Sequence, residues 1–125
     1  MILGFRNAQA AILENDFKKT GANTLLCTDD GTYGRKGVVT AALEEHLELE
    51  RPDYICACGP MVMLKKVTEI AMAHSIPCQI SLEERMACGV GACLGCACKI
   101  RRNGEEVYLH VCKDGPVFSG EEVVF

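Results

Sequence analysis

The sequence predicts an α/β fold with a partial parallel sheet, flanking helices and a small cysteine-rich domain with short strands. Two observations predict it. Over residues 1–81, stretches typical of strands alternate with stretches typical of helices, an order that forms parallel sheets. From about Ser81 the helix pattern stops, and a loop rich in cysteine and glycine leads into short strands. We therefore expect two domains, residues 1–81 and 82–125.

In the first part, predicted strands and helices alternate regularly along the chain. Short apolar stretches predict strands at residues 1–5, 23–28, 53–58 and 77–82. Apolar residues at helical spacing predict helices at residues 8–19, 38–50 and 60–75. Gly21 stops the first helix, and Pro60 suits the first position of the third.

The second part has a clear hairpin signal. Asn103-Gly104 favours a tight turn between two strands within residues 98–112. The second of these strands is expected to carry Cys112. The tail, residues 113–125, is expected to be extended and to pack back on one of the two parts.

Composition and charge exclude several classes of protein. No run approaches the roughly 18 apolar residues of a membrane-spanning helix, and the N-terminal stretch lacks the pattern of a signal peptide. We expect a cytoplasmic protein. A net charge of -4 with scattered Lys and Arg argues against nucleic acid or a membrane as partner. Nine cysteines in a reducing compartment predict metal or redox chemistry rather than disulfides.

Four cysteines have the spacing of a known metal centre. Cys88, Cys93 and Cys96 form C-x4-C-x2-C, and Cys112 follows further along the chain. This is the plant-type [2Fe-2S] ligand pattern with a distant fourth thiolate. Small residues fill the loop between the thiols, because a backbone that wraps an anionic cluster needs positive φ angles and close contact. These residues are Gly89, Gly91, Ala92, Gly95 and Ala97.

The same cysteines and glycines allow competing interpretations. Zinc sites usually have paired C-x2-4-C knuckles, and only Cys93 and Cys96 fit, so a zinc-stabilised interaction module is the alternative. The run from Gly89 to Gly95 imitates a dinucleotide fingerprint, but it lacks the preceding strand and following helix, and we discard it. Cys98 could replace Cys96 as a ligand, although it is expected to be a small buried residue, as are Cys27 and Cys78.

Two places in the first part could bind a nucleotide, since ligands of parallel α/β sheets bind at the carboxyl ends of strands. Asp29 and Asp30 follow one strand, where a carboxylate can bind ribose hydroxyls and repel an added 2′-phosphate, which favours NAD(H) over NADP(H). Cys58, Gly59 and Pro60 follow another, where glycine admits a planar ring beside a helix N-terminus. Each place, taken alone, is more typical of an ordinary turn.

The complete arrangement resembles the electron-transfer subunit of the dihydroorotate dehydrogenase B type, which is itself similar to ferredoxin reductases. The matching stretches are TDDGTYGRKGVVT (28–40), CGPMVML (58–64), SLEERMACGVGACLGCAC (81–98) and VCKDGPVF (111–118). They occur in the order of the family and span most of the chain.

The resemblance implies three parts: an FAD-binding barrel, an NAD-binding module and a small [2Fe-2S] domain. It also implies docking on an FMN-containing dihydroorotate dehydrogenase catalytic subunit of pyrimidine biosynthesis. NADH would pass a hydride to FAD beside Cys58 and Gly59, and the cluster would relay single electrons to the FMN. Only the last two parts are matched, so we expect a C-terminal portion that is catalytically incomplete by itself and has no catalytic residue of its own. A related NAD-dependent ferredoxin or sulfur reductase subunit shares this architecture.

Overall fold

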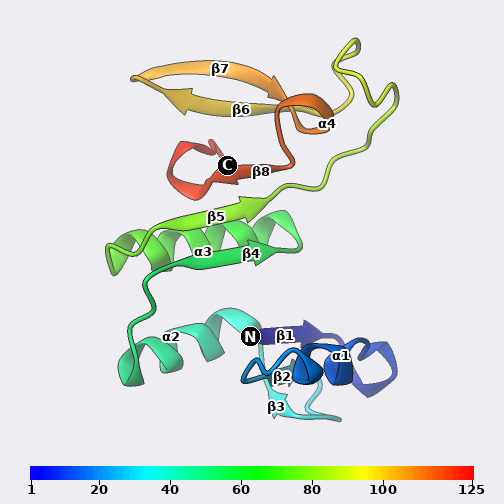
Figure 1. Cartoon of the computed structure of the whole chain (residues 1–125), viewed down its shortest axis with the longest axis vertical. Helices are drawn as coiled ribbons and strands as arrows, with labels where there is room; N and C mark the ends of the chain where they lie inside the picture. The colour runs from blue at the N-terminus through cyan, green and yellow to red at the C-terminus, as the bar shows by residue number, and fades with distance from the viewer. The chain divides into compact units, whose positions relative to one another are not determined.

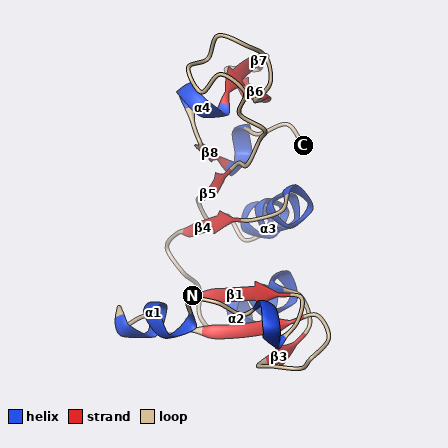
Figure 2. Ribbon diagram, turned by 90° about the vertical axis from the view of Figure 1, so that its right-hand side faces the viewer, coloured by secondary structure: helices blue, strands red, loops and turns tan.

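Parallel strand pairs with helices beside them occur in both units of the protein. The computed structural model describes residues 1–125 and consists of two units, Met1–Arg51 and Pro52–Phe125 (Figure 1). In Figure 2 the strands of each unit, in red, lie beside its blue helices. The predicted α/β class with small parallel sheets is therefore confirmed.

The first unit is built on a parallel sheet in the order β1-β2-β3. Its elements are β1 (Ile2–Phe5), the 3-10 helix η1 (Ala8–Ala10), α1 (Glu14–Lys19), β2 (Leu25–Thr28), β3 (Arg35–Lys36) and α2 (Val39–Leu49). Helix α2 packs on β1, where Gly4 leaves room for the Val39 side chain. Leu26, Cys27 and Leu47 are buried in the core of this unit.

The first predicted helix is wrong in part, because the structure breaks it into η1 and α1. The break falls at Leu13, whose φ is 61°. Two side chains bind backbone N–H groups in η1. Asn7 Oδ1 accepts from Ala10 at 3.0 Å, and Thr32 Oγ1 accepts from Ala8 at 2.9 Å. Thr32 lies in the turn after β2, so spacing within the segment could not reveal its contribution.

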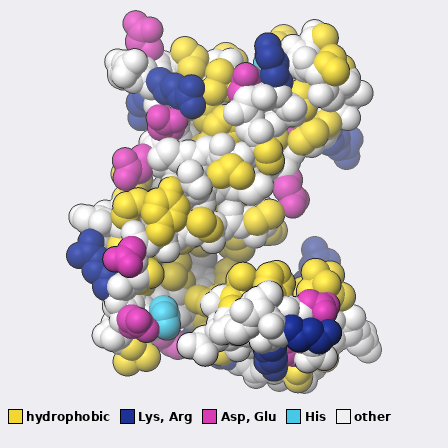
Figure 3. All heavy atoms as spheres, in the orientation of Figure 1, with side chains coloured by type: hydrophobic (Ala, Val, Ile, Leu, Met, Phe, Trp, Pro, Cys, Tyr) yellow, Lys and Arg dark blue, Asp and Glu magenta, His cyan; other side chains and the backbone are white.

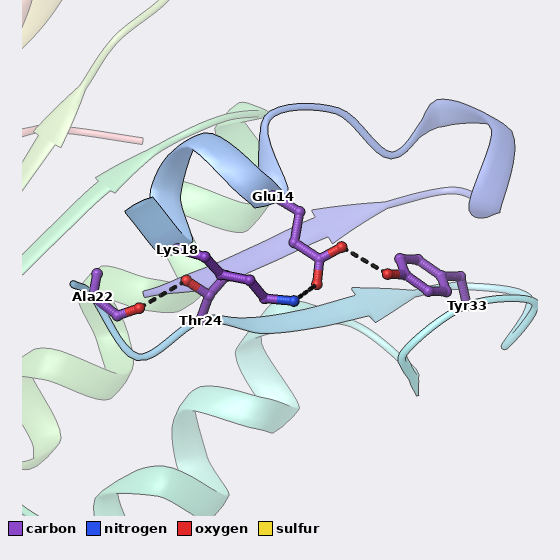
Figure 4. Close-up of polar contacts among 5 residues, drawn as sticks. All are labelled: Glu14, Lys18, Ala22, Thr24 and Tyr33. Carbon is purple, nitrogen blue, oxygen red and sulfur yellow. Dashed lines mark hydrogen bonds and ion pairs between the residues drawn. The ribbon is translucent and has the colours of Figure 1, made fainter. Parts of the chain in front are cut away.

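Polar contacts hold α1 to the turn after β2 (Figure 4). Glu14 accepts hydrogen bonds from the Lys18 ammonium at 2.5 Å and from the Tyr33 hydroxyl at 2.7 Å. Both bonds favour the carboxylate, that of Lys18 most, and lower the pKa of Glu14. The Thr24 hydroxyl donates to the Ala22 carbonyl at 3.1 Å just before β2. The bonds of Glu14 are exposed to solvent, so they orient the short helix more than they stabilise the fold.

The second unit begins with a mixed sheet in the order β4-β5-β8. Strands β4 (Ile55–Cys58) and β5 (Cys78–Ser81) are parallel, and β8 (Val117–Ser119) pairs antiparallel with β5. Helix α3 (Met61–Ala73) packs on β4 and β5. It buries Leu64, Val67 and Ile70, three positions of one apolar helix face.

A hairpin completes the second unit. It consists of β6 (Ala97–Arg102) and β7 (Glu105–His110), and α4 (Val111–Asp114) follows at once. Asn103 and Gly104 have φ angles of 54° and 84°, as the predicted tight turn requires. The tail packs back as expected. After β8 and η2 (Gly120–Glu122), Val123 forms a bridge with the fully buried Ile100.

The two units part between residues 51 and 52, whereas the sequence places the domain boundary at 81 and 82. The physical reason for the difference is β8, which returns from the C-terminal part to pair with β5. Residues after Ser81 therefore share a sheet with β4 and β5, the strands on which α3 packs. A functional boundary at residues 81 and 82 stays a prediction.

The surface carries charges of both signs, interspersed over the face drawn in Figure 3. Hydrophobic side chains also reach the surface, among them Val90 and Leu94. None of the helices has the length and hydrophobicity needed to cross a lipid bilayer.

Candidate metal centre

Three of the four predicted ligands lie on one irregular segment. We call residues 83–96 the cysteine loop, which connects β5 to β6 without helix or strand. Cys88 and Cys93 lie within it, and Cys96 ends it. Gly89 and Gly91 have φ angles of 71° and 75°, which confirms the expected positive φ at both positions.

The placement of Cys112 differs from the sequence prediction. The sequence predicts it on the second strand of the hairpin, but β7 ends at His110, and Cys112 lies in the short helix α4. Two hydrogen bonds turn the chain there. The Val111 N–H donates to the Cys96 carbonyl at 3.0 Å, and the His110 N–H donates to Asp114 Oδ2 at 2.8 Å. The first bond ties the segment of the fourth predicted ligand directly to the third.

Cys88 and Cys93 form the first thiol pair. The N–H groups of Val90, Cys93 and Ala92 and the Cys93 thiol lie near the Cys88 sulfur. These donors favour the thiolate, the Val90 N–H most, and lower the pKa of Cys88 to about 6. The loop backbone thus already favours a negative charge at this sulfur.

Cys96 and Cys112 form the second thiol pair. The Cys112 thiol donates to Cys96, which is the main cause that raises the pKa of Cys112. The charges of Cys96 and Cys88 act in the same direction on the pKa of Cys112. The Gly91 N–H opposes them by hydrogen bonding to the Cys112 sulfur. The four predicted ligands therefore lie in two neighbouring pairs, Cys88 with Cys93 and Cys96 with Cys112, and all are free thiols.

The small residues of the cysteine loop allow the loop backbone to lie close to the thiols and to α4. A Cβ atom on Gly95 would lie 3.4 Å from the Cys93 sulfur. A Cβ atom on Gly91 would lie 2.7 Å from Lys113 Cδ, on the helix that carries Cys112. A Cβ atom on Gly89 would meet nothing within 4 Å, so its positive φ is the feature that favours glycine there. No group of three or more His, Cys, Asp or Glu side chains meets the geometry of a site for a metal ion.

The remaining cysteines that the sequence assigns to the core are buried. Cys98 is 9% exposed, and its thiol donates to the Leu109 carbonyl at 3.5 Å. Burial raises the pKa of Cys98 and likewise the pKa of Cys78. Cys27 is fully buried.

Asp29 and Asp30 lie at the carboxyl end of β2, as expected. Asp30 Oδ1 accepts hydrogen bonds from the Thr32 hydroxyl at 2.7 Å and the Thr32 N–H at 2.9 Å, which lower the pKa of Asp30. This is the turn function that the sequence also allows. Asp30 and Thr32 also line a small cavity of about 150 Å³ beside Asn7 and Gln9, residues that follow β1. Asp29 is exposed, and its carboxylate has no hydrogen-bonding partner.

Cys58, Gly59 and Pro60 connect β4 to α3. Gly59 has a φ of 152°, and Pro60 is the N-cap of α3 rather than its first residue. The Cys58 thiol lies 3.8 Å from Glu83 Oε1, a sulfur hydrogen bond. Sequence reasoning missed this contact, although a signal existed: Cys58 and Glu83 both lie at the carboxyl ends of neighbouring parallel strands. Asp29 and Asp30 belong to the other unit.

The fold and the four thiols point to a class of protein, the iron-sulfur cluster binding domains. Residues 83–124 match the family described as the iron-sulfur cluster binding domain of dihydroorotate dehydrogenase B. The match covers the cysteine loop, the hairpin, α4 and β8.

The particular proteins that the chain resembles are electron transfer subunits. It is 48% identical over 123 residues to the dihydroorotate dehydrogenase B (NAD(+)) electron transfer subunit of Caldanaerobacter subterraneus, covering 98% of this chain and 48% of the relative. It is 42% identical over 124 residues to the probable subunit of the same name from Methanocaldococcus jannaschii, covering 99% and 46%. The resemblance drawn from the sequence is confirmed. The chain spans about half the length of these curated relatives.

A solved structure shows the same fold. A chain of the NADH-dependent reduced ferredoxin-NADP oxidoreductase, solved in work on flavin-based electron bifurcation, matches with a TM-score of 0.79. It is 36% identical, and the match covers 98% of this chain and 43% of that one.

Proposed function

We propose that this chain carries the one-electron relay of an electron transfer subunit, with a [2Fe-2S] cluster held by Cys88, Cys93, Cys96 and Cys112. The observation that carries the proposal is the presence of these free thiols, in two pairs, within a segment that matches an iron-sulfur cluster binding domain. A bound cluster of this kind supplies chemistry in steps of one electron.

The donor set fits such a cluster. Four thiols in two pairs suit a centre of two irons, in which each iron takes two cysteine sulfurs. Cys88 and Cys93 would bind one iron, and Cys96 and Cys112 the other. The N–H groups of Val90, Ala92, Cys93 and Gly91 hydrogen bond to ligand sulfurs and stabilise their negative charge.

We propose that the electrons come from NADH through an FAD group and leave to the FMN of a dihydroorotate dehydrogenase catalytic subunit, in cytoplasmic pyrimidine biosynthesis. Asp29 would accept hydrogen bonds from a ribose of NADH, with Asp30 holding the turn beside it. Cys58, Gly59 and Pro60 would line the position of the nicotinamide ring. Asp29 and Asp30 follow a parallel strand of the first unit, and Cys58, Gly59 and Pro60 follow a parallel strand of the second. Each assignment is supported separately, because parallel sheets bind ligands at the carboxyl ends of their strands.

The zinc-stabilised interaction module is not favoured, because the segment that carries the thiols matches an iron-sulfur family. Metal content separates the two functions directly. Protein purified without oxygen should be reddish brown, hold about two irons and two sulfides per chain, and give an EPR signal after reduction. A colourless chain with one tightly bound zinc and no sulfide would reject the electron relay.

A second acceptor is favoured by one observation, the fold shared with the NADH-dependent reduced ferredoxin-NADP oxidoreductase. The test is a mixing experiment. The chain, reduced with dithionite, is mixed either with an FMN-containing dihydroorotate dehydrogenase subunit or with oxidised ferredoxin, and reoxidation is followed by absorbance. Faster electron transfer to the flavin subunit is expected. A preference for ferredoxin would assign the chain to the second function.

The nucleotide assignment has its own test, the difference in affinity between NADH and NADPH measured by calorimetry. Asp29→Asn should reduce the preference for NADH about tenfold, because a charge-assisted hydrogen bond contributes about 1.5–3 kcal/mol. Asp30→Asn should act mainly through the turn, since its carboxylate already binds Thr32. An unchanged preference in both variants would leave the two aspartates with a turn function only.

A further inference from the structure

The helix that carries Cys112 is too short to be stable by itself. Helix α4 has four residues, Val111–Asp114, and the side chain of its N-cap residue, His110, makes no capping hydrogen bond. One helical turn fixes many dihedral angles for a single backbone hydrogen bond, so its geometry must come from other contacts. These contacts decide where the Cys112 sulfur points.

A carboxylate closes this turn. Asp114 Oδ2 accepts the His110 N–H at 2.8 Å, so the last residue of α4 binds the residue before its first. The imidazole Nδ1 of His110 lies 3.8 Å from the same oxygen, which is too long for a hydrogen bond. The backbone N–H is therefore the hydrogen-bonding partner. A carboxylate that binds the free N–H at a helix start resembles the second half of a capping box.

The rest of the turn is anchored on both sides of Cys112. Before it, Val111 is fully buried and donates its N–H to the Cys96 carbonyl. After it, the chain joins the β5 sheet, because the Pro116 carbonyl accepts the Leu82 N–H at 2.9 Å. Between these anchors, the Asp114 carboxylate makes the only side-chain hydrogen bond that spans Cys112.

We propose that Asp114 is a positioning residue for the fourth ligand. Its carboxylate holds the His110 N–H, and this bond sets the direction in which the Cys112 sulfur meets Cys96. The inference rests on the proposed function and deepens it, because it identifies a residue outside the ligand set on which the geometry of the centre depends. Without the bond, α4 can unwind while Val111 and the β5 sheet stay in place.

The test compares Asp114→Ala with Asp114→Asn. Alanine removes the acceptor, whereas asparagine keeps an amide oxygen that can accept the same N–H. Asp53→Ala is the matched control, since Asp53 is an exposed aspartate of the same unit without a hydrogen bond or ion pair. Each full chain is loaded with iron and sulfide without oxygen. The measurements are iron content, the EPR spectrum of the reduced protein and the rate of iron release to a chelator.

We expect Asp114→Ala to release iron up to about tenfold faster, as the loss of a hydrogen bond of ordinary strength implies, and to show shifted or broadened EPR lines. Asp114→Asn and Asp53→Ala should keep the wild-type spectrum and rate. Rescue by asparagine separates positioning from a loss of charge. If alanine prevents folding, Asp114→Glu takes its place, because its longer side chain moves the acceptor and should alter the spectrum of a folded protein.

Two results would overturn the inference while leaving the proposed function intact: wild-type iron release and EPR in Asp114→Ala, or equal impairment in Asp114→Asn and Asp114→Ala. Circular dichroism of the metal-free variants shows whether the fold is retained. A wild-type chain that binds zinc but no iron and sulfide would instead reject the proposed function, and this inference with it.

Discussion

Serine replacements at Cys96 and Cys98 separate a ligand from a buried neighbour two positions away. Both side chains are buried, with exposures of 1% and 9%, so the two changes place a similar polar group in a similar environment. Cys96 is paired with Cys112, whereas the Cys98 thiol donates to the Leu109 carbonyl. Cys96→Ser should therefore lose the cluster, and Cys98→Ser should keep it.

The magnitudes follow from the contacts. A serine hydroxyl at position 98 can donate to the same carbonyl as the thiol, so we expect a loss of at most about 1 kcal/mol in the free energy of unfolding. Position 96 offers a thiol partner only, and a poorly paired hydroxyl there should cost about 1–3 kcal/mol. The free energies of unfolding of the metal-free variants should thus differ by at most about 3 kcal/mol, while their iron content differs completely.

The assay combines urea unfolding of the metal-free variants with iron and sulfide analysis and EPR after anaerobic loading. Cys98→Ser should hold about two irons per chain and Cys96→Ser close to none. The reverse outcome, a cluster in Cys96→Ser and none in Cys98→Ser, would refute the ligand assignment. Loss of the cluster in both, with both folds intact, would refute the claim that the cluster does not depend on Cys98.

Three further predictions concern the same unit. Gly91→Ala should lower the free energy of unfolding in urea more than Gly89→Ala does. Both positions have a positive φ, which costs alanine about 1–2 kcal/mol, but only a Cβ atom at position 91 would meet Lys113. Equal losses of unfolding free energy would show that the Lys113 side chain moves aside at no cost. Alkylation of Cys88 in the metal-free chain should accelerate with pH around a midpoint near 6. Because folding lowers the pKa of Cys88, its thiolate stabilises the fold fully above the ordinary cysteine pKa. This contribution is lost as the pH falls through about 6. An alkylation midpoint above about 8 would contradict the influence of the neighbouring N–H groups on Cys88. Phe118→Ala should lower the free energy of unfolding by about 3–5 kcal/mol in urea, since the Phe118 side chain on β8 is only 4% exposed. A loss below about 1 kcal/mol would mean that β8 does not contribute to the core.

Local patterns in the sequence were enough to predict many of the helices, strands and turns of this protein. Strand and helix periodicity along residues 38–82 predicted α2, β4, α3 and β5, because each pattern depends on neighbours within one element. Asn103-Gly104 determined the hairpin turn, since few other residues adopt two successive positive φ angles. The spacing of Cys88, Cys93 and Cys96 determined the candidate ligands, because a short loop must place them close together whatever surrounds it.

Tertiary structure decided what depends on distant partners. The break at Leu13, in the segment where the sequence predicts one helix, comes with a hydrogen bond from the Ala8 N–H to Thr32, which lies beyond β2. The place of Cys112 in α4 rather than on the strand depends on the Cys96 carbonyl and on Asp114. The arrangement of the thiols in two pairs likewise forms only once the loop and α4 are packed together. Periodicity records which face of an element is apolar, but a hydrogen bond between residues far apart in the chain leaves no periodic signal.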